Sequence, residues 1–499
     1  MQSLLPSGGQ PCCFGERTKL RCRFQLCLLL LLWQVLQFPT STEALDNGTY
    51  LLGFLAPTAG INIPENLAIE WQSAFQVAVD VLNSNRSYTL LPHVEDSECS
   101  PMPAQSGAHV MLQQDGLIGA VGPACSHAAI AAARIFDLEG PATLLSFAAT
   151  AEPLSDRGYY PTFFRTVYSD KHQAMAIAAS FDRLDIVNAT LLYTKEFYSS
   201  NLAMNINETV GGLSMILLEE GPNNSTVDRD QLRTILDSLQ PTDFVILVVQ
   251  PTAAEEVWEA AYEMGKTDFP WWYFGTDGAT VFDPLDVDPN LVNALQGEIG
   301  LAPYGGDLSP DSKCNQFYTY WQEMGDKYPG LPALGANKSR SYVPYLFDAV
   351  TAFYKVLDNL EAAGLEFTRE RVYLAFNESG TGKISFDGCT GLVEFDPETG
   401  SRSVAAQPAV YDVVSLTDHS WELKGRIENA TFVALEPLDR PGMHPAPGQD
   451  YIGQNPKRKV SAGLIAGIVF LVIAIMVLIT ACFVYYARKR KSSIFVRIT

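Results

Sequence analysis

The sequence has few histidines and none of the short motifs that usually mark an active site. Its six histidines are scattered, without an H-E-x-x-H pattern or the spacing of a metal cluster. No G-x-S-x-G nucleophile elbow occurs, and Gly116, Gly119 and Gly122 do not fit the G-x-G-x-x-G dinucleotide fingerprint. We therefore expect no enzyme activity, no cofactor and no metal site.

Basic residues are scarce as well. Lysine and arginine together number 34, against 56 aspartates and glutamates, which gives a formal net charge of -22. An acidic surface repels nucleic-acid phosphates, so we expect no nucleic-acid partner. Taken alone, the acidity indicates only a soluble exterior.

Long hydrophobic runs are confined to two segments. Residues 26–36 are apolar, follow several basic residues and precede small ones, but are too short to cross about 30 Å of hydrocarbon. They predict a secretory signal peptide over residues 1–44, with an uncleaved anchor as the alternative. Residues 460–487 carry no charge and are long enough to span a membrane.

The two segments together predict a single-pass type I protein of the plasma membrane. Basic residues flank the second segment on both sides, so the signal peptide decides the orientation and places the N-terminus outside. Residues 437–459 are rich in proline and glycine and read as a stalk, and residues 488–499 form a cytoplasmic tail. The G-x-x-x-G spacing of Gly463 and Gly467 favours a homo- or heterodimer, which we expect to form through this helix and through residues 48–165 and 304–382.

Glycosylation sequons and cysteines agree with an exterior location. Between the two segments, N-x-[ST] sequons predict a glycosylated surface at Asn47, Asn85, Asn188, Asn207, Asn223, Asn224, Asn337, Asn377 and Asn429. The same region holds four cysteines, Cys99, Cys125, Cys314 and Cys389. An even number in an oxidising compartment predicts two disulfides. Three pairings are open, of which we favour Cys99–Cys125 and Cys314–Cys389.

The order of hydrophobic patterns predicts an α/β fold. From residue 50 onward, short apolar runs such as 51–55 alternate with helical patterns such as 65–83, and a second series of this kind runs from 170 to 274. Continuous apolar strands between helices indicate parallel sheets that are covered on both faces. Two series therefore predict two lobes, and the alternating residues 386–424 predict antiparallel strands.

Several motifs resemble a known family when they are taken in order. They are GPACS at 122–126, AAR at 132–134, LSFAAT at 145–150, LSD at 154–156, YPTFFRT at 160–166, FDGCTGLVEFD at 386–396 and YDVV at 411–414. This order resembles the receptor family ligand-binding region, the two-lobed Venus-flytrap fold of type I periplasmic binding proteins. The chain is most similar to the ectodomains of GABA-B and other class C receptors, over about residues 48–430.

The resemblance implies an extracellular ligand-binding domain over residues 45–436. Its first lobe would take residues 48–165 and 304–382, and its second lobe residues 166–300 and 387–430. Three segments would then cross between the lobes, near 164–167, 300–304 and 380–387. A small ligand held between the lobes favours the closed form as far as it binds that form better.

The resemblance also implies a ligand site of five residues. Ser126 would cap a helix and bind a ligand carboxylate, and Asp277 would pair with a ligand ammonium group. Thr150 matches a second pocket residue of the family, and Asp170 and Tyr198 match two further ligand contacts. Each residue also has a plain structural interpretation, as a cap, a turn or a core aromatic. Together they suggest an amino acid or amino-acid-like ligand.

One position departs from the family pattern. Tyr342 stands where GABA-B agonist-binding subunits carry a glutamate for the ligand amine. No clear basic pair for a second ligand carboxylate can be assigned either, so the identity of the amino acid stays open. We therefore expect a receptor or co-receptor that signals through a partner chain. The alternatives are a ligand-blind accessory or adhesion subunit and a ligand-clearance receptor.

Overall fold

The computed structural model describes residues 48–435, except 59–62, 85, 185, 187, 223–224, 241–243, 268–270, 282–287, 331–341, 378–383 and 418–419. The predicted signal peptide, stalk, membrane segment and tail all lie outside these residues. Within the part described, no helix is both long and apolar enough to cross a membrane. Both large sheets belong to one compact unit, which begins at Tyr50.

The first lobe is built on a five-stranded sheet with the order β2-β1-β3-β4-β5. The neighbouring strands β1 and β3, β3 and β4, and β4 and β5 pair in parallel, as their continuous apolar runs predict. Its strands are β1 (Thr49–Ala56), β2 (Thr89–Asp96), β3 (Leu117–Val121), β4 (Thr143–Ser146) and β5 (Phe163–Arg165). The short 3-10 helix η1 (Glu152–Ser155) lies between β4 and β5 in the chain.

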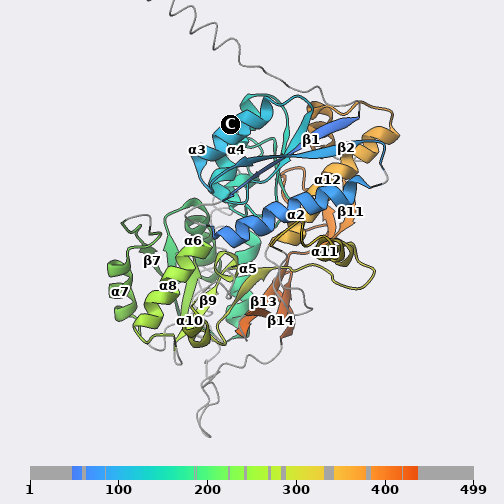
Figure 1. Cartoon of the computed structure of the whole chain (residues 1–499). Coiled ribbons are helices and arrows are strands. Elements are labelled where there is room, and N and C mark those ends of the chain that lie inside the picture. The colour runs from blue at the N-terminus through green and yellow to red at the C-terminus, as the bar shows by residue number, and fades with distance from the viewer. Residues whose placement is uncertain are drawn as a thin grey trace, which may run out of the picture. The chain divides into compact units, whose positions relative to one another are not determined.

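Helices from two distant parts of the chain surround this sheet and share its hydrophobic core, with α11 packed against α2 (Figure 1). They are α2 (Glu65–Asn83), α3 (Pro101–Leu112), α4 (Ser126–Leu138), α11 (Lys313–Glu323), α12 (Val343–Ala362) and α13 (Arg369–Asn377). On α2, Leu67, Trp71, Phe75 and Val79 are buried, which is the helical face that their spacing predicts. α12 lies so close to β3 that a Cβ added to Gly119 would meet the ring of Phe353 at 2.5 Å.

The second lobe is built on an eight-stranded sheet with the order β15-β14-β13-β10-β9-β8-β6-β7. Strands β6 to β10 pair in parallel, and β13 to β15 extend the sheet as antiparallel neighbours. The strands are β6 (Ala189–Thr194), β7 (Ser214–Leu218), β8 (Phe244–Val248), β9 (Trp272–Gly275), β10 (Ile299–Pro303), β13 (Val410–Thr417), β14 (Ser420–Glu428) and β15 (Thr431–Leu435). The helices are α5 (Asp170–Arg183), α6 (Phe197–Val210), α7 (Arg229–Ser238), α8 (Pro251–Glu263), α9 (Asp277–Thr280) and α10 (Pro289–Ala294).

The third crossing between the lobes differs from the prediction. The hairpin of β11 (Ser385–Gly388) and β12 (Gly391–Glu394) packs with the first lobe, because Phe386, Val393 and Phe395 belong to its core. The ring of Phe395 also lies 5.8 Å from that of Phe164. The chain therefore crosses between Phe395 and Val410, and the prediction that the second lobe resumes at 387 is wrong.

Both favoured disulfides form. Cys99 pairs with Cys125 at a Cα–Cα distance of 5.4 Å, and Cys314 of α11 pairs with Cys389 at 4.5 Å. The second bond fixes the turn of the β11–β12 hairpin to the first lobe, which is a further reason why this hairpin does not belong to the second lobe.

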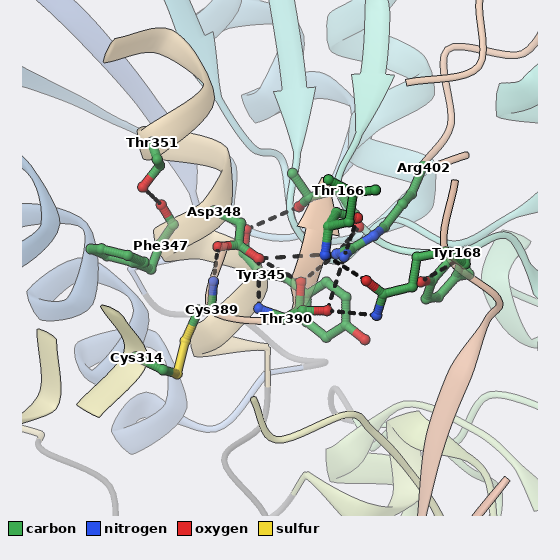
Figure 2. Close-up of polar contacts among 12 residues, drawn as sticks. Thr166, Tyr168, Cys314, Tyr345, Phe347, Asp348, Thr351, Cys389, Thr390 and Arg402 are labelled. Atoms are coloured by element: carbon green, nitrogen blue, oxygen red, sulfur yellow. Dashed lines mark hydrogen bonds and ion pairs between the residues drawn. A yellow bond between two sulfur atoms is a disulfide. The ribbon is translucent and has the colours of Figure 1, made fainter. Parts of the chain in front are cut away.

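A buried polar cluster joins the first and third crossing segments (Figure 2). Asp348 of α12 accepts backbone N–H bonds from Cys389 at 2.5 Å and Thr390 at 2.9 Å, and lies 4.0 Å from the guanidinium of Arg402. Arg402 donates to the carbonyl oxygens of Thr390 and Leu392, both at 2.9 Å, and to that of Thr166 at 3.5 Å. Neither charged side chain is exposed.

A second buried arginine joins the same two segments. Arg165 donates through Nε to the Ser401 hydroxyl at 2.8 Å and through Nη1 to the Ala151 carbonyl at 2.9 Å. Its backbone N–H bonds the carbonyl of Gly400 at 3.1 Å. Burial lowers the pKa of Arg165 to about 10, so it remains charged at neutral pH.

Candidate functional site

A cavity of about 40 Å³ lies where loops of the two lobes meet. The residues that line it are Ile63, Trp71, Ala124, Cys125, Ser126, Ala148, Tyr198, Gln250, Pro251, Asp277, Gly278, Val281 and Tyr342. Ser126 follows β3, Gln250 follows β8 and Asp277 follows β9, so the cavity lies at the carboxyl ends of parallel strands, where α/β folds bind ligands. The space holds roughly three water molecules.

Asp277 is the acidic residue of this cavity. It is the first residue of α9 and its side chain is buried. Its Oδ1 accepts a hydrogen bond from the Tyr198 hydroxyl and its Oδ2 accepts one from the Tyr342 hydroxyl. Burial and the nearby Asp277 carboxylate raise the pKa of both phenols well above the usual value, so both hydroxyls keep their protons and donate them.

The two phenols reach Asp277 from different lobes. Tyr198 lies on α6 in the second lobe, and its hydroxyl also accepts the Gly278 backbone N–H at 3.2 Å. Tyr342 directly precedes α12 and belongs to the core of the first lobe. The Tyr342–Asp277 bond therefore links the two lobes across the cavity.

Ser126 lines the cavity but does not cap its helix. The N-cap of α4 is Cys125, and Ser126 is the first helical residue, with a hydroxyl that accepts the Ala151 backbone N–H at 3.2 Å. The predicted capping role is therefore wrong by one position. Ser126 still lies at the N-terminal end of α4, where backbone N–H groups lack partners within the helix and the helix dipole favours anions.

Thr150 and Asp170 do not line the cavity. The Asp170 backbone N–H donates to the Thr150 carbonyl at 2.9 Å, and both side chains are buried. Neither carboxylate oxygen of Asp170 has a hydrogen-bond partner among the described residues. Burial, and after it the Asp277 carboxylate, raise the pKa of Asp170 well above its usual value, which favours the neutral acid.

Sequence reasoning did not place most of the cavity wall in the site, and Trp71 and Gln250 are its two largest polar or aromatic omissions. Trp71 fits the apolar face of α2, so its spacing shows only a core position. Gln250 could have been found, because it directly follows a strand, at the same edge of the second sheet as Asp277. None of the residues that line the cavity is basic, so its electrostatics favour a cation or a dipolar ligand.

Comparisons with known proteins agree with this architecture. Residues 70–417 match the family model described as receptor family ligand binding region. Metabotropic glutamate receptor-like protein E of Dictyostelium discoideum is 23% identical over 330 residues, which cover 62% of this chain and 36% of that protein. Gamma-aminobutyric acid type B receptor subunit 1 of Mus musculus is 24% identical over 366 residues, which cover 66% of this chain and 36% of the receptor.

The match to the family model extends over most of the described residues, reaches into both lobes and includes every residue that lines the cavity except Ile63. The chain spans only about a third of the length of the curated relatives that it matches. On the strength of the family match, this chain belongs to the receptor family ligand-binding region.

Proposed function

We propose that this protein is a cell-surface receptor or co-receptor that binds a small amino-acid-like ligand between its two lobes. The supporting observation is that Ser126 from one lobe and Asp277 from the other line the same cavity. The N-terminal end of α4 suits a ligand carboxylate. Asp277, with the rings of Tyr198 and Trp71 on the cavity wall, suits an ammonium group.

The small cavity limits what can bind without rearrangement. A space of about 40 Å³ admits a few atoms, so an amino acid has to widen the cavity or displace a side chain. Because the walls come from both lobes, widening the cavity separates the lobes, whereas displacing a side chain does not. In the first case ligand binding and lobe movement are coupled, and the ligand shifts the equilibrium only by its differential affinity for the two forms.

The ligand proposal is tested by thermal shift of the purified full chain against amino acids, small amines and small carboxylates. A ligand present at 100 times its Kd stabilises the protein by about 2.7 kcal/mol, which is readily detected. Ser126→Ala and Asp277→Asn should remove the shift, while the exposed Asp115→Asn should retain it. The ligand site is rejected if the whole panel leaves the melting temperature unchanged.

We propose in addition that residues 460–487 anchor the protein in the plasma membrane with both lobes outside the cell. A chain that ends at residue 459 should be secreted, while the full chain should stay with the membrane fraction. Asn188, Asn377 and Asn429 are exposed and therefore accessible to glycosylation. Glycosidase treatment of the secreted form should lower its apparent mass, and an unchanged mass would argue against an extracellular location.

A ligand-blind accessory subunit is the second candidate function. It is favoured by the two phenols on Asp277, which already supply a hydrogen bond to each carboxylate oxygen. In that case the lobes serve as a surface for a partner chain, and the thermal-shift panel gives no response.

A further inference from the structure

Tyr342 makes the contact that a ligand amine is expected to make in the proposed site. Its hydroxyl donates to Asp277 Oδ2 from the opposite lobe, across 65 positions of the chain. We propose that Tyr342 is a built-in substitute for the ligand amine, which holds the lobes closed without ligand and with which amine ligands must compete. The competition between Tyr342 and amine ligands rests on the proposed function, whereas the closure of the lobes by Tyr342 does not.

Further hydrogen bonds hold the backbone at both ends of this contact. On one side, the hydroxyl of Thr166 in the first crossing segment donates to the Tyr345 carbonyl at 2.9 Å and so secures the first turn of α12. On the other side, the Thr276 hydroxyl donates to the Leu247 carbonyl at 2.9 Å and secures the residue before Asp277. Because neither side chain sits on a loose loop, the Tyr342–Asp277 bond breaks mainly when the lobes separate.

The Tyr342–Asp277 hydrogen bond joins a phenol to a carboxylate in a buried setting, which strengthens it. A hydrogen bond from a neutral donor to a carboxylate is charge-assisted and stronger than one between two neutral groups. Asp277 and Tyr342 are only 2% and 6% exposed, so little water competes with the phenol while the cavity is closed. A second contact across the lobes, His127 Nδ1 to Glu196 Oε2, is 3.8 Å long and exceeds hydrogen-bond distance.

Tyr198 provides a matched comparison. It donates to the other oxygen of the same carboxylate, but it lies in the same lobe as Asp277. Tyr198→Phe therefore removes an equivalent phenol bond without removing a link between lobes. Tyr342→Phe removes the link and keeps the ring, which is packed 6.2 Å from the ring of Tyr345.

Lobe closure can be measured without a ligand. Spin labels are attached through Met102→Cys on α3 and Met204→Cys on α6, which are 80% and 55% exposed. The labelled protein is the full chain in which the cysteines outside the two disulfides, Cys12, Cys13, Cys22, Cys27 and Cys482, are replaced by serine. Pulsed electron resonance then reports the distance between lobes. The unchanged chain and Tyr198→Phe should share one short distance, and Tyr342→Phe should populate a longer one. Equal distances in all three proteins overturn the proposal.

The competition is measured with methylammonium and glycine as probes, by thermal shift of the same full-length proteins. Removing the competing phenol should tighten binding of both probes in Tyr342→Phe by about tenfold. Unchanged or weaker binding contradicts the competition. If neither probe binds either protein but the lobes still open in Tyr342→Phe, the closure is supported and only the ligand site fails.

Discussion

Asp170 is the most unusual single residue near the cavity. Its carboxyl group is fully buried, close enough to Asp277 to be affected by that charge, and has no hydrogen-bond partner among the described residues. Burying an ionised carboxylate is costly, and for Asp170 this cost outweighs the Thr150 hydroxyl and the Arg165 charge, which favour the ionised form. The carboxyl group therefore holds its proton. A neutral Asp170 adds no negative charge next to Asp277, whose carboxyl group accepts hydrogen bonds from both lobes.

The state of Asp170 predicts a pH dependence of stability. Its pKa in the folded protein exceeds the ordinary value of 3.8, so the folded chain binds a proton that the unfolded chain has released. Stability is then lost as pH rises from about 4 toward the raised pKa. Asp170→Asn removes this loss, so the difference in melting temperature between the variant and the unchanged protein should shift in favour of the variant as pH rises above about 4.

The control for this prediction lies on the same helix. Asp182 is exposed near the end of α5, so Asp182→Asn should follow the unchanged protein at every pH. An Asp170→Asn variant that also runs parallel to the unchanged protein would show that Asp170 is ionised in the folded state.

At the scale of elements, the crossing segments between the lobes depend on two buried arginines. Arg165 and Arg402 satisfy backbone carbonyls and hydroxyls that would otherwise be buried without partners where the segments meet. Asp348 provides the counter-charge for Arg402 and also accepts hydrogen bonds from the turn of the β11–β12 hairpin. The cluster therefore fixes the hairpin, α12 and the first crossing to one another (Figure 2).

Arg402→Met should destabilise the protein strongly. It leaves Asp348 buried without its counter-charge, and removing one partner of a buried ion pair costs about 3–5 kcal/mol. Denaturant unfolding measures the loss. Arg233→Met is the control. Arg233 lies 2.7 Å from Glu263, both side chains are about half exposed, and such exposed ion pairs contribute only about 0–1 kcal/mol to stability. Equal losses in the two variants would contradict a structural role for the Arg402 cluster.

At the scale of the whole molecule, each lobe has a core of its own. Strands β1 to β5 share one hydrophobic core, while the two faces of the eight-stranded sheet carry two others. Cores that share few side chains unfold as separate cooperative units, so damage in one lobe need not spread to the other.

Trp258→Ala tests this independence. Trp258 of α8 is 1% exposed and packs 6.3 Å from the ring of Trp421, so its truncation should cost about 3–5 kcal/mol. Hydrogen exchange should speed up in β8 and β9 and change little in β3 and β4. A uniform increase over both sheets would show that the lobes unfold together.

Local patterns in the sequence determined a large part of this protein. Apolar runs without alternation required parallel sheets with both faces covered, and the order of motifs indicated the receptor family, which the family match confirms. The spacing on α2 predicted its buried face, because helix periodicity depends only on neighbouring residues. Ser126, Tyr198 and Asp277 were placed in a common site by resemblance, and all three line the cavity.

Only the tertiary structure decided what Asp277 contacts and which lobe holds the β11–β12 hairpin. Tyr342 could be recognised in sequence as a departure from the family, but its bond to Asp277 joins residues 65 positions apart in different lobes. The hairpin alternates like any antiparallel pair, and its place in the first lobe follows from long-range contacts such as Cys314–Cys389. Contacts between residues so far apart in the chain depend on how the two lobes fold and pack, and a pattern among neighbouring residues cannot predict them.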